Sequence, residues 1–230
     1  TPPPQPISAL AVGSSVYVKE SGVDTEYLVV HQGNPDVTLY DASCNGTWLL
    51  RRECYGDKIP WSNAASNAYT QSTLVSWVAE TFCNYLDIKD IIKTVKIPYF
   101  SMSSSAVGSL KSLSNGYSCK GFMLSAKELG NDLPLAGGYN PPDGVLLDYF
   151  VSGTTGNARR AAKSGTAYSN YWTRSPATST SVHVWFVTDD SEGDAGIFTY
   201  NNPVSDYARC RPAFILPFDT QVDFQGNIIT

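Results

Sequence analysis

The sequence carries little charge and shows no concentration of basic residues. Asp, Glu, Lys and Arg together make up 16% of the 230 residues, and the formal net charge is −5, whereas about 25% charged residues is usual for a soluble domain. Binding to a nucleic-acid backbone depends on clustered Lys and Arg, and a membrane-spanning helix needs roughly 20 successive apolar residues. The sequence has neither feature, so we expect no nucleic-acid partner and no membrane insertion.

Groups that commonly perform catalysis or bind metals are also scarce. The two histidines, His31 and His183, lie outside any nucleophile motif such as G-x-S-x-G. The five cysteines are widely spaced, without a C-x-x-C zinc pattern. We expect them to be reduced and buried, and a Cys44–Cys54 disulfide stays open as an alternative. The acidic turn at 189–194 does not match a calcium loop, because Ala195 stands where glycine is needed. No catalytic residue, metal or cofactor is predicted.

Aromatic and turn-forming residues are what the sequence has in quantity, with 14 Tyr, 5 Trp, 9 Phe, 18 Gly and 14 Pro. Alternating apolar residues predict strands at 14–20 and 25–31, joined by a turn at Ser21–Gly22, and a further strand at 47–54. Apolar residues at three- and four-residue spacing predict a helix of about four turns over 74–86 and a shorter helix over 88–95. Ser125 and Glu128 form a capping box that should open a short helix.

The remaining segments favour strands and loops. Residues 101–118 are rich in Ser and Gly and predict a long exposed loop, residues 153–165 predict a polar loop, and the type of the apolar segment 144–150 stays open. Strands are expected at 121–124, 171–174, 182–188, 196–200 and 210–216. We therefore predict the α+β class, with a proline-rich linker over 1–11 and one domain over 12–230.

Six short motifs carry a family resemblance. They are CNGTWLLRR (44–52), KIPY (96–99), FMLSAKE (122–128), YWTRSP (171–176), VWFV (184–187) and RPAFILP (211–217). Their succession resembles a domain family that is abundant in gut Firmicutes, their prophages and phages, and it extends from about Val12 to Ile229. The C-terminal half resembles the C-type-lectin-like fold of formylglycine-generating-enzyme relatives and of the variable proteins of diversity-generating retroelements.

The resemblance implies a scaffold that carries displayed loops. Trp172, Arg174, Trp185 and Arg211–Pro212 would form that scaffold, with the arginines tying loops through their planar fork of donors. From 177 to 209 the sequence has no Lys, Gln or Met. Trp185 and Glu192 are the two residues there that randomised adenines in Asn codons could not produce. This composition agrees with a diversified surface.

The candidate contact residues lie between 168 and 208, where Tyr, Ser and Asn are frequent, as they are in antibody paratopes. They are Tyr168, Asn170, Tyr171, His183, Phe186, Thr188, Asp190, Asp194, Phe198, Tyr200, Asn201, Asp206 and Tyr207.

The resemblance and this composition together predict a non-enzymatic ligand- or receptor-binding domain of a phage- or prophage-encoded adhesin. Its location would be a phage tail or the bacterial surface, its ligand a bacterial surface protein or glycan, and its N-terminus would contact tail or surface-assembly proteins. A single glycan site of roughly millimolar Kd would require a homo-oligomeric carrier for stable capture. Two alternatives stay open. One is a divergent relative of the formylglycine-generating enzymes, whose catalytic cysteine pair has no counterpart beside Cys210, and the other is a structural tail or surface module.

Overall fold

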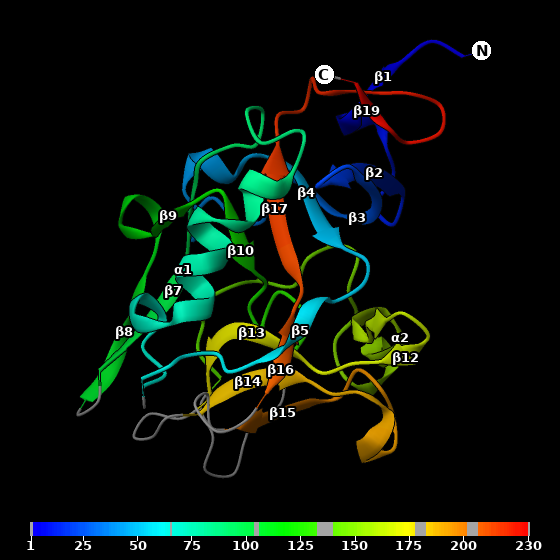
Figure 1. Ribbon diagram of the computed structural model, residues 1–230. Coiled ribbons are helices and arrows are strands. Elements are labelled where there is room, and N and C mark those ends of the chain that lie inside the picture. The colour runs from blue at the N-terminus through cyan, green and yellow to red at the C-terminus, as the bar shows by residue number, and fades with distance from the viewer. Residues whose placement is uncertain are drawn as a thin grey trace.

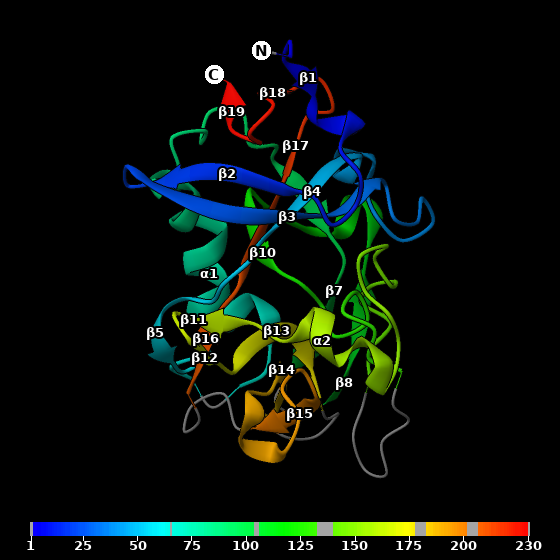
Figure 2. The same cartoon turned by 90° about the vertical axis from the view of Figure 1, so that its right-hand side faces the viewer.

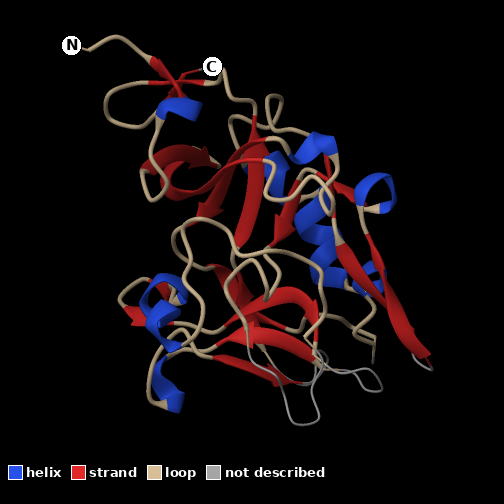
Figure 3. Cartoon of the chain, turned by 180° about the vertical axis from the view of Figure 1, so that it is seen from behind, coloured by secondary structure: helices blue, strands red, loops and turns tan. Residues whose placement is uncertain are grey.

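Strands and loops make up most of this mixed α+β chain (Figure 3). The computed structural model describes residues 2–64, 66–103, 106–132, 140–177, 183–201 and 207–229. Within these ranges the α-helices are α1 (Thr73–Glu80) and the one-turn α2 (Asn157–Arg160), accompanied by short 3-10 turns. In the same ranges, no helix combines the length and apolar character needed to cross a bilayer.

The first five-stranded sheet has the order β10-β17-β4-β3-β2, and all of its neighbouring strands are antiparallel. Its strands are β2 (Ser15–Glu20), β3 (Val23–Gly33), β4 (Gly46–Arg51), β10 (Gly121–Met123) and β17 (Pro212–Leu216). The turn between β2 and β3 has φ of +48° at Ser21 and +89° at Gly22, as a two-residue hairpin turn of the favoured hand requires. The predicted hairpin and the strands predicted at 47–54 and 121–124 are therefore confirmed.

The second five-stranded sheet has the order β15-β14-β13-β16-β5. Its strands are β5 (Tyr55–Ile59), β13 (Tyr171–Pro176), β14 (Val184–Val187), β15 (Phe198–Asn201) and β16 (Ala208–Cys210). The pair β13–β16 is parallel and the other neighbours are antiparallel. Arg211 alone separates β16 from β17, so the chain passes directly from this lower sheet to the first, upper sheet (Figure 1).

Short strand pairs surround the two sheets. They are β1 (Gln5–Pro6), β18 (Gln221–Val222) and β19 (Ile228–Ile229), then β6 (Val95–Ile97) with β9 (Tyr117–Cys119), β7 (Tyr99–Ser103) with β8 (Ala106–Lys111), and β11 (Lys163–Ser164) with β12 (Ala167–Tyr168). Because β1 pairs with β18 and Ile7 is fully buried, residues 5–7 belong to the fold. The prediction of a linker over 1–11 is wrong for these residues. Both chain ends emerge at one end of the molecule (Figure 2).

Both faces of the first sheet are buried, each by its own cluster of apolar side chains. Alternation along a strand sends Trp48 and Leu50 to one cluster and Leu49 to the other. The larger cluster continues beneath the second sheet through Trp172 and Trp185. A nearly continuous apolar strand such as β4 is therefore explained by packing on both sides.

Helix α1 begins as expected but is shorter than the prediction for 74–86. The Ser72 hydroxyl accepts a hydrogen bond from the Val75 N–H at 3.1 Å and caps the helix. Beyond Glu80 the chain tightens into a 3-10 turn that places Phe82 in the smaller apolar cluster, whereas Val78 lies in the larger one. The change of partner cluster explains why the helix ends early.

Two further predictions are wrong because pairing with distant segments decides the local structure. The helix expected at 88–95 is a series of turns that runs into β6, although Ile88 and Ile92 are buried as its apolar face would be. The loop expected at 101–118 contains the β7–β8 hairpin and β9. In that hairpin a Cβ at Gly108 would lie 1.5 Å from the Ser101 carbonyl oxygen, so the strands approach where glycine allows it.

Candidate functional site

The residues expected to form the scaffold are buried. Trp172, Arg174, Trp185 and Arg211 are each 3% exposed or less, and Pro212 is buried as well. The Trp172 indole N–H donates to the Ile59 carbonyl at 2.9 Å and so ties β13 to the end of β5. Scaffold burial was correctly predicted from the sequence.

Arg174 lies at the centre of a buried ion pair with Glu128. Its two terminal nitrogens donate to the two Glu128 carboxylate oxygens, each at 2.6 Å, and both side chains are fully buried. The same guanidinium donates to the carbonyls of Pro98 and Met123 at 3.0 Å and of Asp143 at 2.8 Å. The Ser125–Glu128 capping box forms as predicted, but residues 126–130 are a turn rather than a helix.

A second carboxyl group, Asp143, is buried beside this ion pair. The Ser175 hydroxyl lies 2.8 Å from its Oδ2. Burial raises the pKa of Asp143 to about 7, although Arg174 and the Ser175 contact act in the opposite direction. The scaffold therefore contains one carboxyl group that titrates near neutral pH.

Arg160 joins the loop at 151–157 to the loop that carries the predicted contact residues Asp190 and Asp194. It is 2% exposed, and its guanidinium donates to the carbonyls of Val151, Gly153 and Gly196 at 2.7 to 2.9 Å and to the Asn157 side-chain oxygen at 2.5 Å. The sequence predicted only a polar loop at 153–165, and an arginine in such a segment is ordinarily solvent-exposed. This buried role was missed.

The loops held by Arg160 enclose a hollow of about 410 Å³, which we call the acidic hollow. Its polar lining residues are Thr154, Thr155, Asn157, Tyr168, Asp190 and Asp194. Tyr168 is 41% exposed, and both carboxylates are exposed. Two of the elements that line it, α2 and β12, lie at the right of the lower sheet in Figure 1. Three predicted contact residues, Tyr168, Asp190 and Asp194, thus share one site, whereas Thr154, Thr155 and Asn157 were not predicted.

Glycine at position 196 allows the loop that carries Asp190 and Asp194 to approach α2 closely. Gly196 has φ of +92°, and a Cβ there would lie 2.1 Å from the Asn157 carbonyl oxygen. Asn170 supports the same loop from the other side, because its side-chain oxygen accepts the Asp189 N–H at 2.5 Å. Asn170 is therefore used internally, although it is half-buried rather than fully buried.

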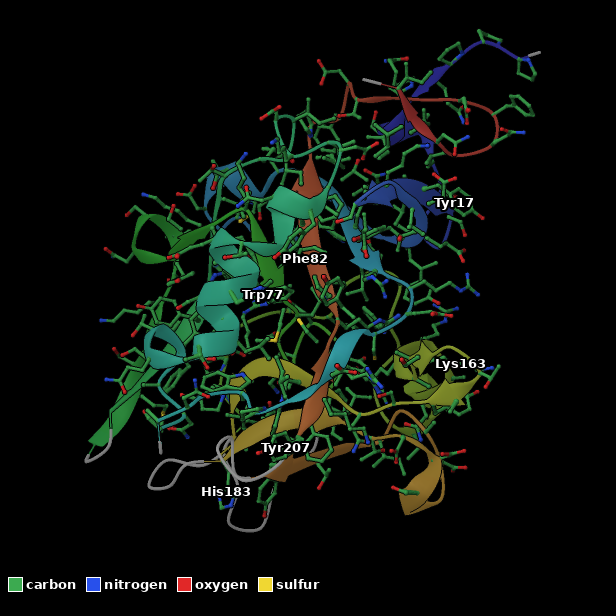
Figure 4. The ribbon with its side chains drawn as sticks, viewed as in Figure 1. Tyr17, Trp77, Phe82, Lys163, His183 and Tyr207 are labelled. Carbon is green, nitrogen blue, oxygen red and sulfur yellow. The ribbon has the colours of Figure 1, made fainter. Side chains whose placement is uncertain are left out.

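A second group of predicted residues lies on the strands of the lower sheet or just before them, with Tyr200 on β15, His183 before β14 and Tyr207 before β16. The half-buried Tyr200 ring packs edge-on against Trp185 and His183, with ring centroids 5.4 and 5.6 Å apart. Tyr207 is 56% exposed. Figure 4 shows His183 and Tyr207 at the end of the molecule opposite to Tyr17.

Four predicted contact residues are buried, so their prediction as surface contacts is corrected. Tyr171 is 2% exposed and its hydroxyl donates to the Arg160 carbonyl at 2.7 Å. Phe186 is 6% exposed and packs edge-on against Trp172. Thr188 is 2% exposed and its hydroxyl donates to the Ile197 carbonyl at 3.2 Å.

Phe198, the fourth, is 8% exposed and its ring lies 4.8 Å from the Arg160 guanidinium carbon. For Phe186, the expected alternation of buried and exposed residues along a strand does not hold, because β14 is buried along its whole length. Asn201 ends β15, and its side chain is outside the described residues, as is Asp206.

All five cysteines are free and buried, as predicted, and no disulfide joins Cys44 to Cys54. Burial raises the pKa of the Cys44 thiol to about 12 and that of Cys54 to about 11. The pKa of Cys210 is raised further by the same cause. Over the described ranges, no cluster of three or more His, Cys, Asp or Glu side chains could hold a metal ion.

Comparison with known proteins places the chain by family. No curated protein and no solved structure matches it. A family model matches residues 45–218, a span that contains β4, the residues that line the acidic hollow and the scaffold arginines. Because the match covers more than half of the chain, the chain belongs to the family described as Domain of unknown function (DUF6273).

Proposed function

We propose that the chain is a non-enzymatic ligand-binding domain with a C-type-lectin-like fold, carried by a phage- or prophage-encoded adhesin and directed at a bacterial surface molecule. The observation that carries the proposal is the acidic hollow, where exposed polar and aromatic side chains stand on loops fixed by the buried Arg160. A rigid scaffold under variable loops is a common arrangement for binding sites.

The chemistry of the acidic hollow suits a ligand rich in hydroxyl groups. The carboxylates of Asp190 and Asp194 can accept hydrogen bonds from sugar hydroxyls, and the exposed Tyr168 ring offers a flat apolar face. No Lys or Arg is among the described residues that line this hollow. A neutral or cationic saccharide is therefore favoured over an anionic one at this position.

Two observations favour binding over catalysis. Cys210, beside which the catalytic cysteine pair of the formylglycine-generating enzymes has no counterpart, is 2% exposed, and burial raises the pKa of its thiol. A reactive thiolate requires the opposite environment. Within the part of the chain that the structure describes, the acidic hollow is also lined by no His, Cys or Lys, the side chains that most often act as a catalytic base or an activated nucleophile.

The test is capture of fluorescently labelled domain by intact gut Firmicutes cells. Asp190→Asn combined with Asp194→Asn should reduce capture about tenfold, and Tyr168→Ser should do the same, because each removes contacts made by the hollow. The matched controls are Asp24→Asn with Asp90→Asn, and Tyr17→Ser, which change the same residue types at exposed positions elsewhere.

The result decides among the candidate functions. Capture that is lost only in the hollow variants, with melting temperatures within about 2 °C, supports the proposal. Undiminished capture by both hollow variants, or no capture of any isolate even by a tetramerised domain, contradicts it. Sequencing the DNA around the gene for a near-identical template repeat beside a reverse transcriptase tests the retroelement link, and evenly scattered differences among sibling copies would favour a structural module.

A further inference from the structure

A second hollow lies on the other side of Tyr168 and has the opposite charge. It encloses about 190 Å³, and we call it the basic hollow. The lining residues that matter here are Arg52, Arg159, Lys163, Arg211, Glu53 and Tyr168. Four cations and one carboxylate thus line a single site in a chain of net charge −5. Figure 4 labels Lys163 beside α2.

The innermost cation, Arg211, has no carboxylate partner among the described residues. It is 3% exposed, and its guanidinium donates to the carbonyls of Arg51, Arg52 and Arg160 at 2.9 to 3.1 Å and to the Tyr171 hydroxyl at 3.3 Å. These partners satisfy its hydrogen bonds but leave its charge uncompensated. A buried charge without a counterion is unfavourable, so an anion in the adjoining hollow would be stabilised.

The outer cations are exposed and positioned by aromatic rings. The Lys163 ammonium lies 5.2 Å from the centre of the Tyr168 ring, and the Arg159 guanidinium carbon lies 5.5 Å from the centre of the Tyr149 ring. Arg159 also donates to the Tyr149 carbonyl at 2.6 Å. Cation–π contacts of this kind orient the cations without neutralising them. Both remain available to an oxyanion.

The remaining charges reduce but do not cancel this positive field. Arg52 pairs with Glu26 at 2.9 Å, so part of its charge is compensated. Glu53 lines the hollow as the one carboxylate and is exposed to solvent. Within the described residues, no carboxylate lies within ion-pair distance of Lys163, Arg159 or Arg211.

We propose that the basic hollow binds a phosphate or carboxylate group carried by a saccharide chain, whose adjoining sugar ring lies against Tyr168. The saccharide source rests on the proposed function, whereas the anion site rests on the basic hollow alone. Arg211 supplies a fixed buried charge, and Arg159 and Lys163 donate hydrogen bonds to the oxyanion. Because Tyr168 lines both hollows, one chain can place an anionic unit in the basic hollow and a neutral or cationic unit in the acidic hollow.

The test measures binding of the whole domain to three immobilised polysaccharides: phosphorylated dextran, polygalacturonate and neutral dextran. The first two distinguish a phosphate from a carboxylate. Lys163→Gln and Arg159→Gln should each weaken binding of the recognised anionic polymer about three- to tenfold, and the double variant more. Glu53→Gln should strengthen it, because it removes a like charge from the ligand's surroundings. The control Lys89→Gln makes the same charge change at an exposed position outside the hollow.

Binding of at least one anionic polymer but not neutral dextran, together with opposite effects of Lys163→Gln and Glu53→Gln, supports the proposal. Equal binding of all three polymers, binding of none, or a double variant that behaves like Lys89→Gln would overturn it. The two proposals can fail separately. Cell capture that depends on Asp190 and Asp194 but not on Lys163 would remove only the anion site, whereas polymer binding without cell capture would remove only the adhesin function.

Discussion

Replacement of Glu128 by glutamine should strongly destabilise the fold, because it removes the carboxylate that pairs with the buried Arg174 guanidinium. Both side chains are fully buried, and two hydrogen bonds of 2.6 Å join them. The glutamine oxygen could still accept from Tyr40, as Glu128 Oε1 does at 2.7 Å. Its NH₂ group would then face Arg174 and the Ser125 N–H, and both of these are donors.

The expected loss is about 3–5 kcal/mol of unfolding free energy, the usual effect of removing one partner of a buried ion pair. For a chain of this size, about 2–4 °C of melting temperature corresponds to each kcal/mol, so the melting temperature should fall by roughly 6–20 °C. Loss of the Glu128 charge also removes one cause of the raised Asp143 pKa. Asp143 would then ionise more readily and offset part of the loss above neutral pH.

Urea unfolding followed by tryptophan fluorescence at pH 7.5 measures this loss directly. The control is Lys19→Gln, which breaks a surface pair with Asp24 whose atoms are 3.6 Å apart and whose side chains are 56% and 66% exposed. Such a pair should contribute less than about 1 kcal/mol. If Glu128→Gln and Lys19→Gln give the same unfolding free energy, the buried pair does not stabilise this fold and the reasoning is refuted.

Three further predictions concern the scaffold and the acidic hollow. Between the ordinary pKa of Asp143, 3.8, and its native pKa of about 7, the folded chain holds a proton that the unfolded chain has lost. The unfolding free energy of the wild type should therefore decrease as the pH rises through this window, by up to about 4 kcal/mol. In Asp143→Asn, urea unfolding at pH 4.5 and at pH 7.5 should give nearly equal unfolding free energies. A difference as large as that of the wild type would show that another group causes the pH dependence. Gly196→Ala places a methyl group 2.1 Å from the Asn157 carbonyl oxygen at positive φ, so it should cost about 1–3 kcal/mol and reduce cell capture; a variant as stable as wild type would contradict this. The five buried thiols should resist Ellman's reagent at pH 8 and all react in guanidinium, and rapid labelling of native Cys210 would reopen the enzyme alternative.

The parts of the fold that the sequence predicts well are those fixed by local patterns. Strand alternation and a two-residue turn predict the β2–β3 hairpin. The burial of the Trp and Arg residues of β13 and β14 was expected from the family resemblance and not from a local pattern, and it is confirmed. The β7–β8 hairpin was missed because serine and glycine in a paired strand resemble a loop until the partner strand is known. The C-type-lectin-like fold stays a prediction.

The candidate site was only partly predictable for a similar reason. Tyr168, Asp190 and Asp194 were identified from composition, and they do meet in one hollow. Tyr171 and Phe198 were included wrongly, because nothing in the sequence showed that the Arg160 carbonyl would accept from the Tyr171 hydroxyl or that the buried Arg160 guanidinium would lie against the Phe198 ring. Arg159 and Arg160 are adjacent and identical in type, yet one is exposed and the other is buried. That difference depends on which carbonyls the fold brings near each guanidinium.

The direct passage from β16 to β17 through Arg211 has a mechanical consequence. The chain ends emerge beyond the upper sheet, and His183 and Tyr207 lie at the opposite end (Figures 2 and 4). If the proposed adhesin is anchored through its termini, tension on a ligand bound in the acidic hollow beside the lower sheet would pass through Arg211 into β17, which lies between β10 and β4. Pulling a central strand along its own axis loads its hydrogen bonds on both sides at the same time, whereas peeling an edge strand breaks them one after another. Under the proposed function, the connection between the two sheets would therefore be loaded in the direction in which paired strands separate least easily.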